Sequence, residues 1–312
     1  MKNALRENYN INEKINILEN NNYCSFLFGD RKYYFMPYIR SDDELEDLIS
    51  MNDELLRKDI PTFRFILNKN NQYLTEHLNK KYILFETPLN LSQEYDILDM
   101  LNYSHQLVIN NKKSLLYRNR WAQLWSSKID YFEYQVAELG KNKPLIVNSF
   151  SYYVGLAENA ISYVNNTLKK HQISIYEKIT LQRKRIAFPN ILLNYFNPLN
   201  YIIDIEVRDI ASYFKSLFFN SDENLWLEIN TYLKRKSLSI YGYQLLYARL
   251  LYPSYYFDIY EKVMEDKIKE EELLKIINKS SSYEQFLKKI FLVISKYAPI
   301  EPIDWLISSQ KS

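Results

Sequence analysis

Residues 23–56, YCSFLFGDRKYYFMPYIRSDDELEDLISMNDELL, decide the fold. Two aromatic-rich, β-prone segments, 23–28 and 32–38, are separated by a short turn, and an amphipathic helix opens at Ser41. Three further strand-like segments follow, at residues 62–67, 72–76 and 81–86. The order strand, strand, helix, strand, strand, strand predicts a small antiparallel sheet with a helix on one face.

Helical periodicity dominates the rest of the chain. We expect helices over residues 91–109, 117–139, 149–168, 209–219, 222–234, 239–251, 255–277 and 282–296. The stretch 172–205 is predicted as strands and loop because short apolar runs alternate there with prolines and asparagines. The sequence therefore predicts an α+β, two-lobe fold like that of protein kinases. Residues 1–88 would form the sheet-rich lobe and residues 89–312 the larger helical lobe.

Composition excludes several classes of protein. The 40 basic and 38 acidic residues leave a net charge of +2, which argues against a nucleic-acid partner. The single cysteine cannot form an intrachain disulfide, and no apolar run approaches the ~20 residues of a membrane span. The first residues lack the apolar stretch of a signal peptide, so we expect synthesis in the cytoplasm. The four glycines are far apart, which removes the usual glycine-rich nucleotide loops.

Phosphoryl transfer requires a loop over the phosphates, a lysine paired with a helix glutamate, an aspartate base, and Asn and Asp ligands for Mg²⁺. The first turn has one glycine, Gly29, and the adjacent charge of Asp30 would repel phosphate. The middle of the next strand, residues 34–36, contains no lysine. Glu44 could be the helix acid, although its spacing from Ser41 also predicts a capping box.

The segment expected to hold the catalytic base, residues 178–190 (KITLQRKRIAFPN), contains no acid. Three cations follow one another at residues 183–185, Arg-Lys-Arg, and this run predicts a solvated loop. Its two arginines, Arg183 and Arg185, could contact an anion. Asp204 ends an apolar strand and is a candidate for half of a vestigial metal site. Asp209 begins the following helix, where a carboxylate complements the helix dipole and plays a structural part.

Nothing else in the sequence indicates catalysis. The three histidines are far apart and have no metal-ligand spacing, so we assign no metal site, catalytic residue or cofactor, and nucleotide binding is doubtful. Arg249 lies in an apolar helix and, if buried, should need a carboxylate or carbonyl partner.

Five segments, in order along the chain, resemble the spore coat-associated proteins of the YutH and CotS group. They are Arg120–Phe132, Ser149–Ala160, Val207–Ala211, Tyr247–Phe257 and Ile303–Leu306. That group is similar in fold to aminoglycoside and choline phosphotransferases. The resemblance places residues 181–183, Leu-Gln-Arg, at the His-x-Asp positions of the superfamily. It places Asp204 at the metal aspartate and Asp209 at the structural aspartate.

The leading hypothesis is a non-catalytic, kinase-like protein that is made in the cytoplasm, joins the spore coat and contacts other coat proteins. One alternative is an active small-molecule phosphotransferase that uses ATP and Mg²⁺ in a rearranged site, with Asp204 and either Asn190 or Asn194 holding the metal. Another is a pseudokinase that senses nucleotide without turnover.

Overall fold

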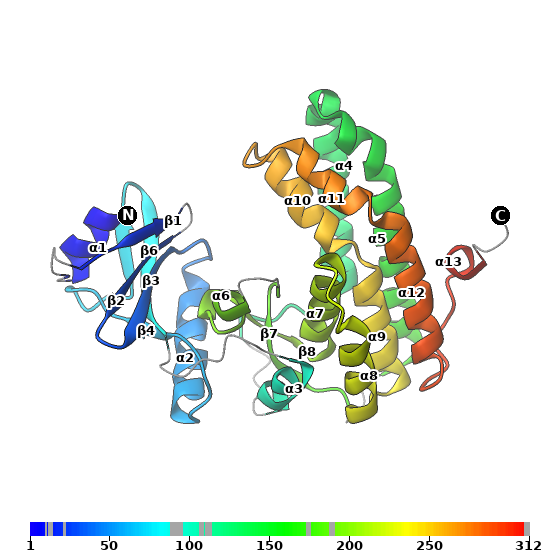
Figure 1. The fold of residues 1–312 in the computed structure, drawn as a ribbon, viewed down its shortest axis with the longest axis horizontal. Coiled ribbons are helices and arrows are strands. Elements are labelled where there is room, and N and C mark those ends of the chain that lie inside the picture. The colour runs from blue at the N-terminus through cyan, green and yellow to red at the C-terminus, as the bar shows by residue number, and fades with distance from the viewer. Residues whose placement is uncertain are drawn as a thin grey trace.

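The computed structural model describes residues 1–9, 11, 15–20, 23–87, 96–105, 109, 114–172, 176–186 and 191–308, without the side chains of 104, 105, 191 and 192. Figure 1 shows a sheet lobe at the left and a taller helical lobe at the right, with α6 and the β7–β8 hairpin between them. This arrangement confirms the predicted α+β fold of two lobes. The predicted boundary at residues 88 and 89 lies outside the described residues.

The sheet of the first lobe is antiparallel throughout, in the order β1-β2-β3-β6-β4, with β5 also paired to β6. Its strands are β1 (Leu18–Asn20), β2 (Tyr23–Phe28), β3 (Arg31–Pro37), β4 (Arg64–Ile66), β5 (Leu74–His77) and β6 (Lys80–Glu86). Alternate side chains enter two separate cores, as the two-residue period of a strand requires. Tyr34 joins the main core, whereas Phe35 packs on the opposite face.

A helix serves each of these two cores. α2 (Asp43–Arg57) buries Leu48 and Leu55 in the main core, as predicted. α1 (Lys2–Tyr9) packs Ala4 and Leu5 into the second core. The sequence prediction missed α1, because only two buried apolar residues mark its inner side.

The helical lobe surrounds α9 (Ile240–Leu251), which is buried along most of its length and packs against its neighbours α5 and α7. The other helices are α3 (Ile97–His105), α4 (Trp121–Leu139), α5 (Pro144–Lys170), α6 (Ile191–Tyr195), α7 (Val207–Phe219), α8 (Leu225–Arg235), α10 (Ser254–Met264), α11 (Leu274–Ile277), α12 (Ser280–Ile294) and α13 (Asp304–Ser308). The hairpin of β7 (Ile179–Arg183) and β8 (Tyr201–Ile205) is antiparallel. Among the described residues, no helix is both long and apolar enough to cross a membrane.

Several predicted elements differ from the observed ones. α4 begins at Trp121 rather than at residue 117, α8 begins at Leu225 rather than at residue 222, and α6 lies within the stretch 172–205 that the sequence predicts as strands and loop.

α5 begins at Pro144 rather than at residue 149, because proline is compatible with the first turn of a helix. The segment 255–277 is not one helix: α10 ends at Met264, and Asp266 takes a left-handed φ of 53° before a 3₁₀ turn and α11. Asp266 tolerates this conformation better than most residues would, so the chain turns there.

Candidate functional site

Asp204 lies on β8 at the junction of the two lobes, and its side chain is 0% exposed. Its Oδ2 accepts hydrogen bonds from the Trp121 indole Nε1 at 2.8 Å and from Arg208 Nη1 at 2.6 Å. Its Oδ1 accepts a bond from the backbone N–H of Ile205 at 2.8 Å. The carboxylate is therefore neutralised by an arginine and satisfied by two further donors.

Arg208 lies four residues after Asp204, in the first turn of α7. Besides the ion pair, its Nε donates to the backbone carbonyl of Arg183 at 3.2 Å. Burial lowers the pKa of Arg208, while the ion pair with Asp204 opposes that shift. Arg208 thus links the candidate metal aspartate to the segment that ends β7.

Asp209 and Arg183 form a second buried pair. Asp209 Oδ1 accepts the backbone N–H of Arg183 at 2.7 Å, and its Oδ2 lies 3.2 Å from Arg183 Nη1. The Arg183 guanidinium also lies over the Tyr195 ring, 3.6 Å from its centroid. The expectation of a solvated loop was wrong for Arg183, which is fully buried because this carboxylate and ring compensate its charge. Asp209 fixes the path of the chain after β7.

Arg185 makes a bidentate contact with Asp258 on α10. Its Nε and Nη2 lie 2.5 and 2.7 Å from the two carboxylate oxygens. Burial would raise the pKa of Asp258, but the charge of Arg185 outweighs it and the pKa is lowered. The fork geometry suits a planar guanidinium and a carboxylate, so both groups are held in a fixed orientation.

Glu44, the candidate helix acid, faces the lobe junction. One oxygen accepts Arg40 Nε at 2.8 Å and the other pairs with Arg118. Burial opposes its ionisation, yet the two arginines lower its pKa overall. The predicted capping box with Ser41 is therefore wrong: α2 begins at Asp43, and arginine side chains occupy the carboxylate instead.

Arg40 joins the two lobes. Its Nη1 donates to the backbone carbonyls of Leu199 at 3.1 Å and Tyr201 at 2.6 Å, while its Nε holds Glu44. The Arg40 guanidinium thus connects Glu44 of α2 to Tyr201 at the start of β8, the strand that carries Asp204, and orients α2 over that strand. The middle of β3 contributes no cation here, since Tyr34 to Met36 are buried and apolar.

These contacts do not fit a site for Mg²⁺ and nucleotide. A Mg²⁺ ion keeps several waters and phosphate oxygens beside its carboxylate ligands, whereas the Asp204 and Asp209 side chains are buried and both oxygens of each already accept hydrogen bonds. Asn194 Oδ1 lies 3.5 Å from the amide of Asn200, and Asn190 is outside the described residues. Across the described ranges, no group of three or more His, Cys, Asp or Glu side chains is placed to hold a metal.

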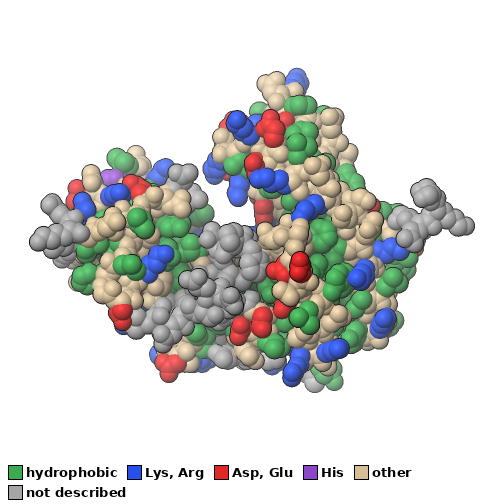
Figure 2. Space-filling model, in the orientation of Figure 1, with side chains coloured by type: hydrophobic (Ala, Val, Ile, Leu, Met, Phe, Trp, Pro, Cys, Tyr) green, Lys and Arg blue, Asp and Glu red, His purple; other side chains and the backbone are tan. Residues whose placement is uncertain are grey.

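Two hollows lie near this junction. One, of about 1140 Å³, runs between α7 and α10 and has Arg185, Lys215 and Asp258 in its lining. Figure 2 shows the notch between the lobes, with Lys and Arg side chains gathered together with Asp and Glu on the wall of the helical lobe.

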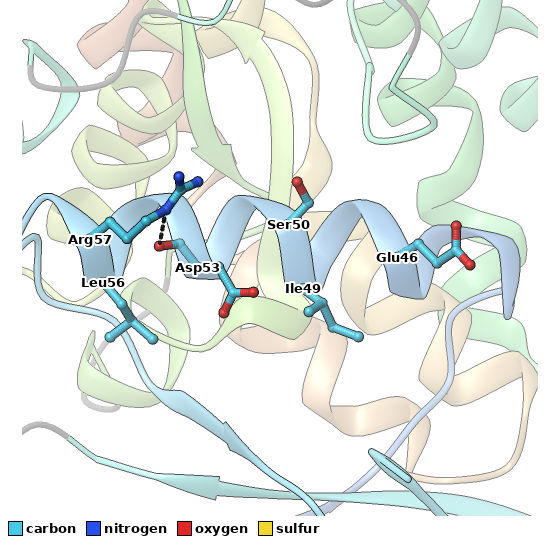
Figure 3. Close-up of a pocket in the computed structure, with 6 residues that line it drawn as sticks. All are labelled: Glu46, Ile49, Ser50, Asp53, Leu56 and Arg57. Carbon is cyan, nitrogen blue, oxygen red and sulfur yellow. Dashed lines mark hydrogen bonds between the residues drawn. The ribbon is translucent and has the colours of Figure 1, made fainter. Parts of the chain in front are cut away.

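The other hollow, of about 730 Å³, lies along one side of α2. Six residues of that single helix line it, and Figure 3 shows them in a row with Arg57 Nε bonded to the Asp53 carbonyl. All of its lining residues come from α2, so polar groups of different elements do not converge there, and we assign no function to this hollow.

Several of these contacts were missed in the sequence. Arg208 lies only four residues after Asp204, but the pair spans the end of β8 and the start of α7, so the i, i+4 spacing of a helix does not predict it. Trp121 is 83 positions from Asp204, and Arg40 is 161 positions from Tyr201, so no local pattern reveals either contact.

The sheet lobe and the helical lobe together have the kinase-like architecture of solved phosphotransferases. A solved aminoglycoside phosphotransferase from Alicyclobacillus acidocaldarius matches with a TM-score of 0.58 at 11% identity, covering 95% of this chain and 97% of that one. The AMP-bound spectinomycin phosphotransferase APH(9)-Ia matches with a TM-score of 0.54 at 12% identity, covering 99% and 98%. At such identities the likeness concerns the fold alone.

The particular family follows from the sequence. The family described as "Spore coat putative kinase YutH" matches residues 2–290, and the chain belongs to it. The endospore coat-associated protein YutH of Bacillus subtilis (strain 168) is 27% identical, with 92% of this chain and 91% of that protein covered. The predicted resemblance and the kinase-like fold are both confirmed.

Proposed function

We propose that this chain is a non-catalytic, kinase-like protein of the spore coat that acts through contacts with other proteins. The observation that carries the proposal is the state of Asp204, whose carboxylate is bound by Arg208, Trp121 and the backbone of Ile205. A phosphotransferase stabilises its transition state with metal and charge placed beside the phosphates. A guanidinium on the metal aspartate supports the loss of that function.

The end of β7 supports the same conclusion. The described residues 176–186 contain one acid, Glu177, whose carboxylate accepts the backbone N–H of Ser239 at 2.6 Å. By the resemblance, the position of the catalytic aspartate is occupied by Arg183, whose guanidinium is buried against Asp209. A guanidinium does not accept a proton from a hydroxyl group.

The name of the Bacillus subtilis relative supports the proposed location. The Bacillus subtilis relative is named as an endospore coat-associated protein, and we place this chain in the spore coat after synthesis in the cytoplasm. Exposed tyrosines on α4 offer contact area for coat proteins: Tyr131 is 56% exposed and Tyr134 is 65% exposed. Tyrosine buries a large area at little entropic cost and keeps a polar hydroxyl, which suits protein contacts.

Two measurements test the proposal. A fluorescent fusion followed through sporulation should concentrate at the surface of the developing spore, and a signal confined to growing cells would contradict the assignment. A thermal titration with ATP should show no shift that depends on Mg²⁺. A ligand at 100 times its Kd stabilises by about 2.7 kcal/mol, so a functional Mg²⁺–ATP site would be visible.

Turnover assays separate the remaining alternatives. A Mg²⁺-dependent shift with phosphate transfer to a small molecule would establish an active phosphotransferase. A shift of that kind without transfer would establish a nucleotide sensor, and Asp204→Asn should then abolish it. A parallel ATP titration in EDTA measures the stabilisation by ATP that does not need Mg²⁺. Subtracting it leaves the shift that depends on the metal.

A further inference from the structure

The groove between α7 and α10 is lined by Arg185 and Lys215, and further cations lie next to it. Four cations lie close enough to influence one another: Arg185, Arg208, Lys215 and Arg249. Asp204 pairs with Arg208 and Asp258 with Arg185, and the charges of Asp209 and Glu261 also reach this cluster. Among the described residues, no carboxylate makes an ion pair with Lys215 or Arg249, although Asp258 and Asp204 are near enough for their charges to act on them.

Lys215 lies on α7 in the lining of the groove and is 7% exposed. Its Nζ donates to the Tyr252 carbonyl at 2.6 Å and to Ser254 Oγ at 3.3 Å, both neutral acceptors. Burial, followed by the charges of Arg249 and Arg185, lowers its pKa well below the usual value. A buried ammonium group without a carboxylate is costly unless an anion joins it.

Arg249 projects from α9 and is 6% exposed. The predicted carboxylate or carbonyl partner was wrong, since in the described part of the chain its guanidinium has neither a hydrogen bond nor an ion pair. The group lies instead over Trp121 and Trp125, with ring centroids 4.7 and 5.4 Å away. Burial and the charge of Arg208 lower its pKa strongly. The five N–H donors of the Arg249 guanidinium are thus held against the two tryptophan rings and donate no hydrogen bond within the described residues.

Tyr252 adds a neutral donor. Its ring stacks on Trp125, with centroids 4.2 Å apart, and its hydroxyl is buried without a hydrogen-bond partner in the described structure. The hydroxyl is close enough to Arg185 and Arg249 for their charges to act on it. A buried hydroxyl without a partner is costly, so its presence close to two arginines indicates a missing acceptor.

The rim of the groove is electrically balanced. Glu261 pairs with Lys128 at 2.9 Å, and Glu265 pairs with Lys267 at 2.7 Å. Among the described residues, the cation of the lining near the inner wall that makes no ion pair is therefore Lys215, which lies beside the Arg185–Asp258 pair.

We propose that this groove binds a small oxyanion, a phosphate or carboxylate group, which Lys215 holds beside the Arg185–Asp258 pair, with the charge of Arg249 and the Tyr252 hydroxyl behind it. Guanidinium and ammonium groups recognise these oxyanions through charge-assisted hydrogen bonds. Binding requires neither Mg²⁺ nor turnover, so the proposal is independent of the function proposed above.

The test is a thermal titration of the full chain with sodium phosphate and, in a separate arm, sodium citrate, each against NaCl of equal ionic strength. The melting temperature should rise and saturate with at least one of the two anions, and the stronger arm identifies the headgroup. A response equal to that of NaCl in both arms would overturn the proposal.

Variants locate the binding site. Lys215→Met and Arg249→Met should each weaken the anion response at least tenfold, without the large loss of basal stability that removal of a compensated buried ion would cause. Lys289→Met is the matched control, because Lys289 also lies over a tryptophan, 3.8 Å from the Trp226 ring, but outside the groove. An unchanged anion response in both groove variants would refute the site.

A variant that should strengthen anion binding tests the proposal if both methionine variants fail to fold. Asp258→Asn removes one carboxylate from the cluster and frees Arg185 for the ligand. The anion should then bind more tightly and raise the melting temperature by more than in the wild type. A weaker or unchanged response in folded Asp258→Asn would count against the proposal.

Discussion

The contact between Asp204 and Arg208 predicts an unequal response to the loss of either partner. Breaking a buried ion pair from one side costs about 3–5 kcal/mol, because the remaining charge is left uncompensated. In Arg208→Met, the carboxylate still lies near Arg249 and keeps its bonds from Trp121 and Ile205. In Asp204→Asn, Arg208 is left among other arginines. We therefore expect Asp204→Asn to be the more destabilising change.

The magnitude follows from the size of the chain. With an unfolding entropy of about 2.1 cal/mol/K per residue, 1 kcal/mol corresponds to about 1.5 °C for this chain of 312 residues. Asp204→Asn should cost about 4–5 kcal/mol and lower the melting temperature by about 6–8 °C. Arg208→Met should cost about 2–3 kcal/mol, or about 3–5 °C, because part of the positive excess is relieved.

Scanning calorimetry and urea unfolding of the two variants and of their double mutant measure these differences. The double mutant should be more stable than the sum of the single losses predicts, by about 1–3 kcal/mol of coupling. Glu54→Gln is the control, since it breaks the exposed pair with Lys58 at the same i, i+4 spacing and should cost only about 0.3–0.5 kcal/mol. Equal losses, or a larger loss in Arg208→Met, would refute the charge-excess reasoning.

Three further changes have expected outcomes. Burial and neighbouring arginines lower the pKa of Lys184 to about 8, so between pH 8 and 10.5 the unfolded chain binds more protons and this group adds stability as the pH rises. The free energy of unfolding gains at most about 1.4 kcal/mol per pH unit, and partial exposure of Lys184 reduces this. Lys184→Met should remove the rise, which urea unfolding at several pH values measures. Trp121→Phe loses the indole donor to Asp204 and should cost about 1.5–3 kcal/mol in urea unfolding, while an unchanged midpoint would contradict the bond. Gly242→Ala places a Cβ 2.6 Å from Glu177 Oε1 and should cost about 1–3 kcal/mol, with a neutral calorimetric result opposing this account.

The fold was largely predictable from local patterns. Aromatic alternation in 23–28 and 32–38 and the apolar period of α2 both report on neighbours close in sequence. The errors arose where tertiary contacts outweighed local signals. Glu44 has capping-box spacing but is bound by Arg40 and Arg118, and the 255–277 pattern continues through a break at Asp266.

The site was less predictable than the fold. The sequence identified Asp204 and the absence of an acid among residues 178–190, because each is a property of one short segment. It did not reveal that Asp204 is already satisfied, since the indole that binds it comes from α4. Nor did it show that Arg249 would be buried over tryptophan rings without a counter-ion. Contacts between distant segments depend on the packing of the helical lobe.

The central claim is that Asp204 is not available to a metal ion. Electron paramagnetic resonance of Mn²⁺, a spectroscopic substitute for Mg²⁺, tests it on the wild-type chain in the presence of ATP. The account predicts that the protein adds no bound Mn²⁺ beyond that held by ATP alone. One equivalent of protein-bound Mn²⁺ per chain that Asp204→Asn abolishes would contradict it.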